Sequence, residues 1–208
     1  MKKLFFILLM IPVVILAQDK NTLIGVKAGF VSSSIVEDIP GFDKKPKPGF
    51  LVGGFFDYNL TDNISLSTGL NYVTKGASFR ATSMMYTDNN GQPIDFINYD
   101  VWLNYLELPV MVKASIGNKV KPYLSTGLAP AINVLAKYKY SINERKEKIN
   151  LDRSFDIGYL INGGMQVDLN GKALLIEVRY NLGLVTAVEN GFQNVKSSYF
   201  SINTGIGF

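Results

Sequence analysis

The side chains that could do chemistry in this sequence are carboxylates, lysines and arginines, because its 208 residues include neither histidine nor cysteine. Without histidine the chain lacks the usual general base and the commonest metal ligand. Without cysteine it lacks thiolate nucleophiles, disulfides and zinc–sulfur sites. Ser–His, Cys–His and His–metal mechanisms are therefore excluded. We expect no cofactor and no metal site.

The best remaining arrangement for catalysis is a pair of carboxylates, Glu107 and Glu177, which could in principle do acid–base work. Arg179 follows Glu177 by two residues, so on a strand the two side chains share a face. A neighbouring arginine favours an ion pair over proton transfer. We therefore predict that the protein is not an enzyme.

The first 17 residues have the layout of an export signal. Lys2 and Lys3 precede an apolar run over 4–16, and Ala17 ends that run. The run contains Pro12 and is shorter than the roughly 20 residues that a membrane-spanning helix needs. We expect a cleaved secretory signal peptide at 1–17 and one domain over 18–208. A retained N-terminal anchor helix is the alternative.

In the rest of the chain apolar and polar residues alternate, which is the pattern of β-strands with two different faces. Eight such segments lie at 23–31, 49–59, 64–75, 101–116, 121–136, 155–169, 172–184 and 197–208. Most are longer than the five or six residues usual in globular proteins. They match the roughly 9–11 residues of a tilted strand that crosses a bilayer.

The connections between these segments alternate between short and long. The short ones are 60–63, 117–120 and 170–171, and the long ones are 32–48, 76–100, 137–154 and 185–196. Tight periplasmic turns and longer outer loops are typical of membrane barrels. A sheet in hydrocarbon has to close, because each backbone group needs an internal partner. The fold we predict is all-β, an eight-stranded antiparallel up-and-down transmembrane β-barrel.

Two further features bear on this fold. Pro109 and Pro130 fall inside predicted strands, so we expect a bulge or a break at each. Aromatic residues lie near the strand ends, as in the interfacial girdles of membrane barrels. They are Phe30, Phe50, Tyr72, Trp102, Phe155 and Phe200 at the outer end, and Tyr58 and Phe208 at the periplasmic end.

Several short motifs, in order over 23–208, resemble one known family. They are Gly25–Gly29, Tyr105–Pro109 with Lys113, Pro122–Tyr123, Gly127, Phe155–Gly158, Gly163–Gly164, Glu177, Arg179–Tyr180, Gly183–Leu184 and Phe208. The chain resembles the Bacteroidetes outer-membrane β-barrel domain family of the PorT type. The resemblance implies an eight-stranded barrel in the outer membrane of a Gram-negative cell. It also implies that Phe208 is the C-terminal signal read by the barrel-assembly machinery.

Six charged residues carry inward parity in the predicted barrel: Lys27, Asp57, Glu107, Lys113, Glu177 and Arg179. Counted from the strand ends, Glu107 and Arg179 lie at similar heights, and so do Lys27 and Asp57. Opposite charges in a narrow lumen should pair, because an unpaired buried charge is costly. A structural charge network that plugs the lumen is the interpretation we favour, since side chains fill eight-stranded barrels. A gated or proton-linked channel is the alternative.

The sequence leaves three functions open. The first is a non-enzymatic membrane anchor and scaffold, with the lipid bilayer as partner and lipopolysaccharide or a protein as candidate ligand of the outer loops. A lysine-rich run at 43–48 and a mixed-charge run at 144–148 are compatible with such contacts and equally with solvated loop tips, whereas 88–91 is a plain turn rather than a calcium loop. The second is a PorT-like accessory of a secretion or gliding apparatus. The third is a soluble, exported lipocalin-like barrel. The formal net charge of +4 is too small and too dispersed to suggest nucleic-acid binding.

Overall fold

The computed structural model describes residues 21–35, 42–82, 96–140, 146–148, 155–169, 171–184 and 196–208. The regular elements in these ranges are all β-strands. They are β1 (Thr22–Ile35), β2 (Phe42–Asn59), β3 (Ile64–Thr82), β4 (Phe96–Glu107), β5 (Val110–Ser115), β6 (Val120–Tyr140), β7 (Lys146–Lys148), β8 (Phe155–Leu169), β9 (Lys172–Gly183) and β10 (Ser197–Gly207).

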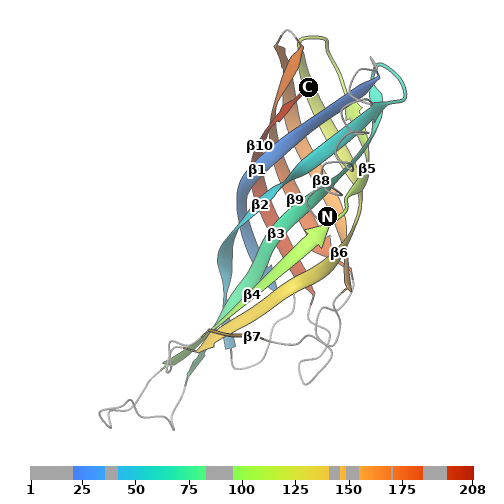
Figure 1. Ribbon diagram of the computed structural model, residues 1–208. Coiled ribbons are helices and arrows are strands. Elements are labelled where there is room, and N and C mark those ends of the chain that lie inside the picture. The colour runs from blue at the N-terminus through green and yellow to red at the C-terminus, as the bar shows by residue number, and fades with distance from the viewer. Residues whose placement is uncertain are drawn as a thin grey trace, which may run out of the picture.

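These strands close into a ring (Figure 1). Each long strand pairs antiparallel with its neighbours in the chain, and β1 pairs with β10 to complete the circle. β4 and β5 are two halves of one barrel strand, because both lie between β3 and β6. β7 is a short addition beside β6. The predicted all-β, eight-stranded, antiparallel up-and-down barrel is confirmed.

The two faces of the strands have opposite chemistry. Along β9 exposed and buried residues alternate from Lys172 to Asn181. The exposed ones are Leu174, Ile176, Val178 and Tyr180, and the buried ones include Glu177, Arg179 and Asn181. On this strand apolar side chains thus cover the outside, and charged and amide side chains lie inside. A lipocalin-like barrel needs the reverse arrangement, so that alternative is excluded.

Among the described residues, no helix has both the length and the apolar character needed to cross a membrane.

The two prolines have different effects, although a bulge or break was expected at each. Pro109 lies in the gap between β4 and β5, whereas β6 continues through Pro130. Pro130 faces that same gap, since Glu107 pairs with Ala131 and Val110 with Leu128. Its missing N–H therefore has no ladder partner to lose on that side. Its carbonyl still accepts a bond of 2.9 Å from the Leu108 N–H.

At the end with the long connections, several strands continue further than expected. β2 begins at Phe42, β3 runs to Thr82, β4 begins at Phe96 and β6 runs to Tyr140. The run at 43–48, expected in an outer loop, therefore lies in β2. At the lower left of Figure 1, β3, β4 and β6 extend past the other strands, with β7 beside them. The run at 88–91 and residues 144 and 145 lie outside the described residues.

Most of the expected girdle aromatics are exposed on the outer surface of the barrel. They are Phe30, Phe50, Phe155 and Phe200 at one end, and Tyr58 and Phe208 at the other. Tyr72 is half-buried and lies beside Phe50, with ring centroids 5.8 Å apart. Trp102 differs from the exposed aromatic residues because a lysine covers its ring. The Lys47 ammonium lies 3.6 Å from the centre of its ring, and the side chain is half-buried.

Candidate functional site

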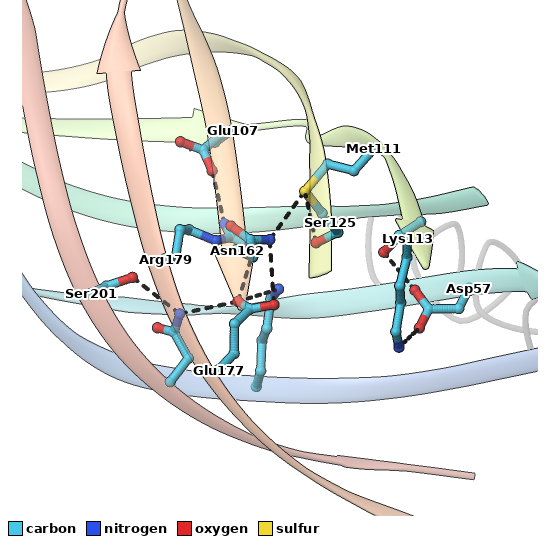
Figure 2. A network of polar contacts seen from close by, with 12 residues as sticks. Asp57, Glu107, Met111, Lys113, Ser125, Asn162, Glu177, Arg179 and Ser201 are labelled. Carbon is cyan, nitrogen blue, oxygen red and sulfur yellow. Dashed lines mark hydrogen bonds and ion pairs between the residues drawn. The ribbon is translucent and has the colours of Figure 1, made fainter. Parts of the chain in front are cut away.

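The six charged residues expected in the lumen are all buried. Their positions on β1, β2, β4, β5 and β9 alternate with the exposed apolar residues of the same strands. Arg179 and Glu107 are completely inaccessible, and the other four are less than one tenth exposed. The structure brings them together in two groups (Figure 2), which lie side by side along the barrel interior.

The first group, here called the central cluster, joins Arg179, Glu107, Glu177 and Lys27. Arg179 Nη1 donates to Glu107 Oε1 at 3.2 Å. Arg179 Nη2 lies 3.2 Å from Glu177 Oε1, which also accepts from Lys27 Nζ at 3.3 Å. Two cations thus balance two carboxylates. Because the residues come from β1, β4 and β9, their contacts reach across the lumen (Figure 2).

Neutral side chains complete the hydrogen bonding of the two carboxylates. Tyr199 donates to Glu107, with its hydroxyl oxygen 3.0 Å from both carboxylate oxygens. Glu177 accepts from Tyr123, Asn162 and Asn203 at 3.2, 3.4 and 3.2 Å. Such bonds are what make a buried charge tolerable.

Gly164 gives Tyr123 the space to reach Glu177. A Cβ at this glycine would lie 2.6 Å from the Tyr123 hydroxyl. That is closer than non-bonded atoms approach each other, so any larger residue at this position would displace the Tyr123 hydroxyl from Glu177. The glycine and the tyrosine are also paired across β6 and β8.

The second group joins Asp57 and Lys113. Lys113 Nζ donates to Asp57 Oδ2 at 2.8 Å and to Gln166 Oε1 at 3.2 Å. Ser67 donates to the other oxygen of Asp57. The expected pairing of Lys27 with Asp57 is wrong. On the neighbouring strands Lys27 lies opposite Gly53, while Asp57 lies opposite Leu23. Four residues of strand, about 13 Å, separate the two positions.

A third buried pair was missed by the sequence analysis. Lys75 and Asp156 are both nearly inaccessible, and the Lys75 Nζ lies 3.5 Å from Asp156 Oδ2. The ammonium also lies 4.8 Å and 5.1 Å from the ring centres of Tyr105 and Tyr199. Both charged residues have inward parity, which was the available signal. They meet across the barrel, and no pattern along a single strand reveals that.

A polar cavity of about 400 Å³ opens at the end of the barrel that carries the short turns. Its lining includes Asp57, Asn59, Ser65, Lys113, Lys121 and Gln166. The next space inward, beside Lys27 and Glu177, is only about 10 Å³, which is at the lower limit for a single water molecule. The described side chains therefore narrow the lumen at the central cluster.

The chemistry of this site is that of ion pairing. Glu107 and Glu177 both contact Arg179, so the carboxylates considered for acid–base work are bound to the same cation. Within the described ranges, no three acidic side chains gather where they would hold a metal ion.

The chain is similar to one known family and to several solved structures. The model of a family described as outer membrane protein beta-barrel domain matches residues 16–188. No curated protein matches the sequence. Three of the similar solved structures are Ail of Yersinia pestis with the heparin analogue sucrose octasulfate, Neisserial surface protein A, and OprG of Pseudomonas aeruginosa.

The sequence identities to these structures are 16%, 15% and 12%, and the TM-scores are 0.46, 0.47 and 0.49. The matches cover 90%, 91% and 90% of this chain, and 99%, 98% and 96% of the other chains. The family model is the decisive finding, because it spans most of the sequence. The chain belongs to the outer membrane protein beta-barrel domain family.

Proposed function

We propose that this outer-membrane barrel is a non-enzymatic anchor and scaffold, whose lumen is plugged by charged side chains and whose outer end meets its partners. The observation that carries this proposal is the position of Arg179. It is completely buried and binds Glu107 and Glu177 at once, each at 3.2 Å. A guanidinium held between two carboxylates fills the lumen and leaves neither of them as a free base.

The plug is preferred to a channel because the contacts run across the lumen. The central cluster and its neutral partners come from β1, β4, β6, β8, β9 and β10, so most of the ring contributes. The fully buried Leu160, Asn71 and Asn181 occupy further interior space. Eight-stranded barrels are commonly filled in this way.

Conductance in planar lipid bilayers tests the plug. We expect the unmodified full-length protein to show no steady conductance after insertion. A large, steady conductance would refute the plug and favour the channel. Insertion is checked on the same preparation by gel mobility, because a folded membrane barrel migrates differently before and after boiling.

The proposed orientation puts the chain ends and the short turns in the periplasm. The alternation of short and long connections supports it. In this orientation the polar cavity opens to the periplasm, while β7 and the extended ends of β2, β3, β4 and β6 lie outside the cell. Protease treatment of intact cells tests the orientation. Cleavage is expected in the long connections and not in the turn at 60–63.

Export and assembly are proposed from the two ends of the sequence. Residues 1–17 are proposed as a signal peptide, removed before residues 18–208 fold as the barrel domain. Phe208, exposed at the end of the last strand, is proposed as the signal for the barrel-assembly machinery.

A PorT-type accessory role in secretion or gliding is the second candidate, and the motifs around Glu107 and Arg179 favour it by resemblance. Affinity capture of the tagged full-length protein from its own outer membrane tests this role. Recovery of secretion components in stoichiometric amounts would support it. Recovery of the barrel alone would favour the simple anchor.

A further inference from the structure

The strand ends beyond the ring form a small sheet of their own, here called the outer sheet. It consists of residues 42–48 of β2, 76–82 of β3, 96–102 of β4, 136–140 of β6, and β7. At the lower left of Figure 1, β3, β4 and β6 continue past β8, β9 and β10, with β7 beside them. Neither the plug nor the bilayer anchor requires this extension, so we looked in its residues for a separate function.

The register of the outer sheet collects lysines in two neighbouring cross-strand rows. The first row runs Trp102, Lys137 and Lys148 across β4, β6 and β7. The second runs Lys45, Ser78, Asp100, Lys139 and Lys146 across β2, β3, β4, β6 and β7. Lys47 joins them, because its Nζ lies 2.9 Å from Asp100 Oδ1 and against the Trp102 ring.

The register gives six lysine positions in or beside these rows and one acidic position, Asp100. Asp100 is already engaged by Lys47 and by the Ser78 hydroxyl. Lys137 lies directly opposite Lys148, and Lys139 directly opposite Lys146. Like charges at such positions destabilise a sheet. A bound anion would remove that cost, so the rows have the charge pattern of an anion-binding surface.

The rows continue the face of the barrel that meets lipid. On β3, Leu66 and Leu70 are exposed on the outer surface. The register between β3 and β4 is unbroken from Asn71 to Thr82, so Ser78 lies on that same face.

The packing of the neighbouring strands leads to the same face. Leu103 and Ala136 pair with each other and pack in an interior cluster. Trp102 and Lys137, the next pair, therefore belong to the outer face. An extra residue in β6, between Asn133 and Leu135, brings Lys137 into this phase.

The position of the rows along the barrel axis indicates which anion they would meet. They begin just beyond the exposed aromatic and aliphatic belt and lie about 7 Å apart, which is two residues of strand. In the proposed orientation this is the level of the headgroups in the outer leaflet. We propose that the outer sheet binds the phosphate groups of outer-leaflet lipids, with Lys45 and Lys137 as the donors. The inference rests on the proposed function in one respect, namely that this end lies outside the cell.

The experiment uses the refolded full-length protein in neutral maltoside micelles, titrated with lipid A, a glucosamine lipid that carries two phosphates. The test variant is Lys45→Gln with Lys137→Gln, which leaves the Lys47–Asp100 pair in place. Each lysine beside an anionic surface contributes about fivefold to binding, so we expect affinity to fall about 25-fold. Binding should also weaken as salt is raised.

The matched control variant is Lys119→Gln with Lys172→Gln. It makes the same change of charge at the short-turn end, where Lys119 and Lys172 are exposed, and its affinity should equal that of the unmodified protein. Equal losses in the two variants, or no loss in the first, would overturn the proposal. So would binding of soluble dextran sulfate as tight as that of lipid A, because the ligand would then be a polyanion in solution.

Two checks keep this result separate from the proposed function. Gel mobility of each unboiled variant shows whether the barrel is folded. Phosphatidylcholine, which has a phosphate but no net charge, is titrated into the unmodified protein and should not compete with lipid A. If the protein is folded and non-conducting but does not bind lipid A, the lipid site is refuted and the proposed plug is unaffected.

Discussion

Replacing Arg179 with methionine isolates the energetic role of the central cluster. Methionine keeps much of the volume and removes the charge. Among the described side chains, Glu107 would keep only the Tyr199 hydroxyl, whereas Glu177 would keep Lys27 and three neutral donors. Removing one partner of a buried ion pair costs about 3–5 kcal/mol. We expect a loss of stability in this range, caused mainly by the carboxylate left at Glu107.

A second substitution, Glu107→Gln, separates charge from volume. Glutamine can still accept from Tyr199, and it carries no charge that needs Arg179. The double variant should therefore be more stable than Arg179→Met alone. Residues in direct contact show coupling energies of about 0.5–3 kcal/mol, and we expect a value in the upper half of that range.

The assay is urea unfolding of the barrel refolded into lipid vesicles, followed by the fluorescence of Trp102, the single tryptophan. Lys121→Met is the matched control. Its ion pair with Asp168 measures 2.9 Å but is about one third exposed, so its loss should cost less than about 1 kcal/mol. If the double variant loses as much as the two single changes added together, the charges are not coupled and the reasoning fails. A steady conductance of Arg179→Met at unchanged stability would make the cluster a gate.

Three further outcomes test the orientation of the strands, the assembly signal and export. Val178→Arg puts a charge on an outward residue of β9 and should cost about 2–4 kcal/mol, against about 0–1 for Ile116→Arg in a short turn, measured by the same unfolding assay. Phe208→Ala should slow assembly in cells, seen as unfolded precursor in the periplasm, whereas Phe200→Ala, at an exposed aromatic residue within β10, should not. Intact-mass measurement of the protein from outer membranes should find a chain that begins at Gln18, and a chain that retains Met1 would contradict the signal peptide.

The parity of the strands was readable from the sequence because the bilayer imposes it. Glu177 and Arg179 alternate with Ile176 and Val178, and the structure has the first pair inside and the second outside. A strand between lipid and a polar lumen has to alternate in this way. The number of strands and their antiparallel order follow, because each segment of alternation is one crossing.

The partners of the buried charges were harder to predict. Lys27 binds Glu177, and Asp57 binds Lys113, although heights counted along the chain put Lys27 beside Asp57. Barrel strands are tilted and staggered, so residues that meet across the lumen differ in distance from their strand ends. The Lys75–Asp156 pair was missed because the two residues meet across the barrel, and no pattern along a single strand reveals such a contact.

The outer sheet was not foreseen either, because its sequence has the composition of a loop. Residues 43–48 contain three lysines and two prolines, which suggest a solvated turn. In the structure they extend β2, and Lys45 pairs with Ser78. Pairing with a longer neighbour, β3, overrides the local preference.

The charges of the two regions differ in a way that bears on function. In the lumen each cation of the central cluster contacts a carboxylate, so the cluster is electrically closed and needs no ligand. In the outer sheet six lysines share the rows with one aspartate, and lysines lie opposite lysines. Such a surface gains most from an anion, and its cost to stability without one is the physical reason to look for the partner there. We infer that the lumen holds the barrel together and that the outer sheet is where it engages its surroundings.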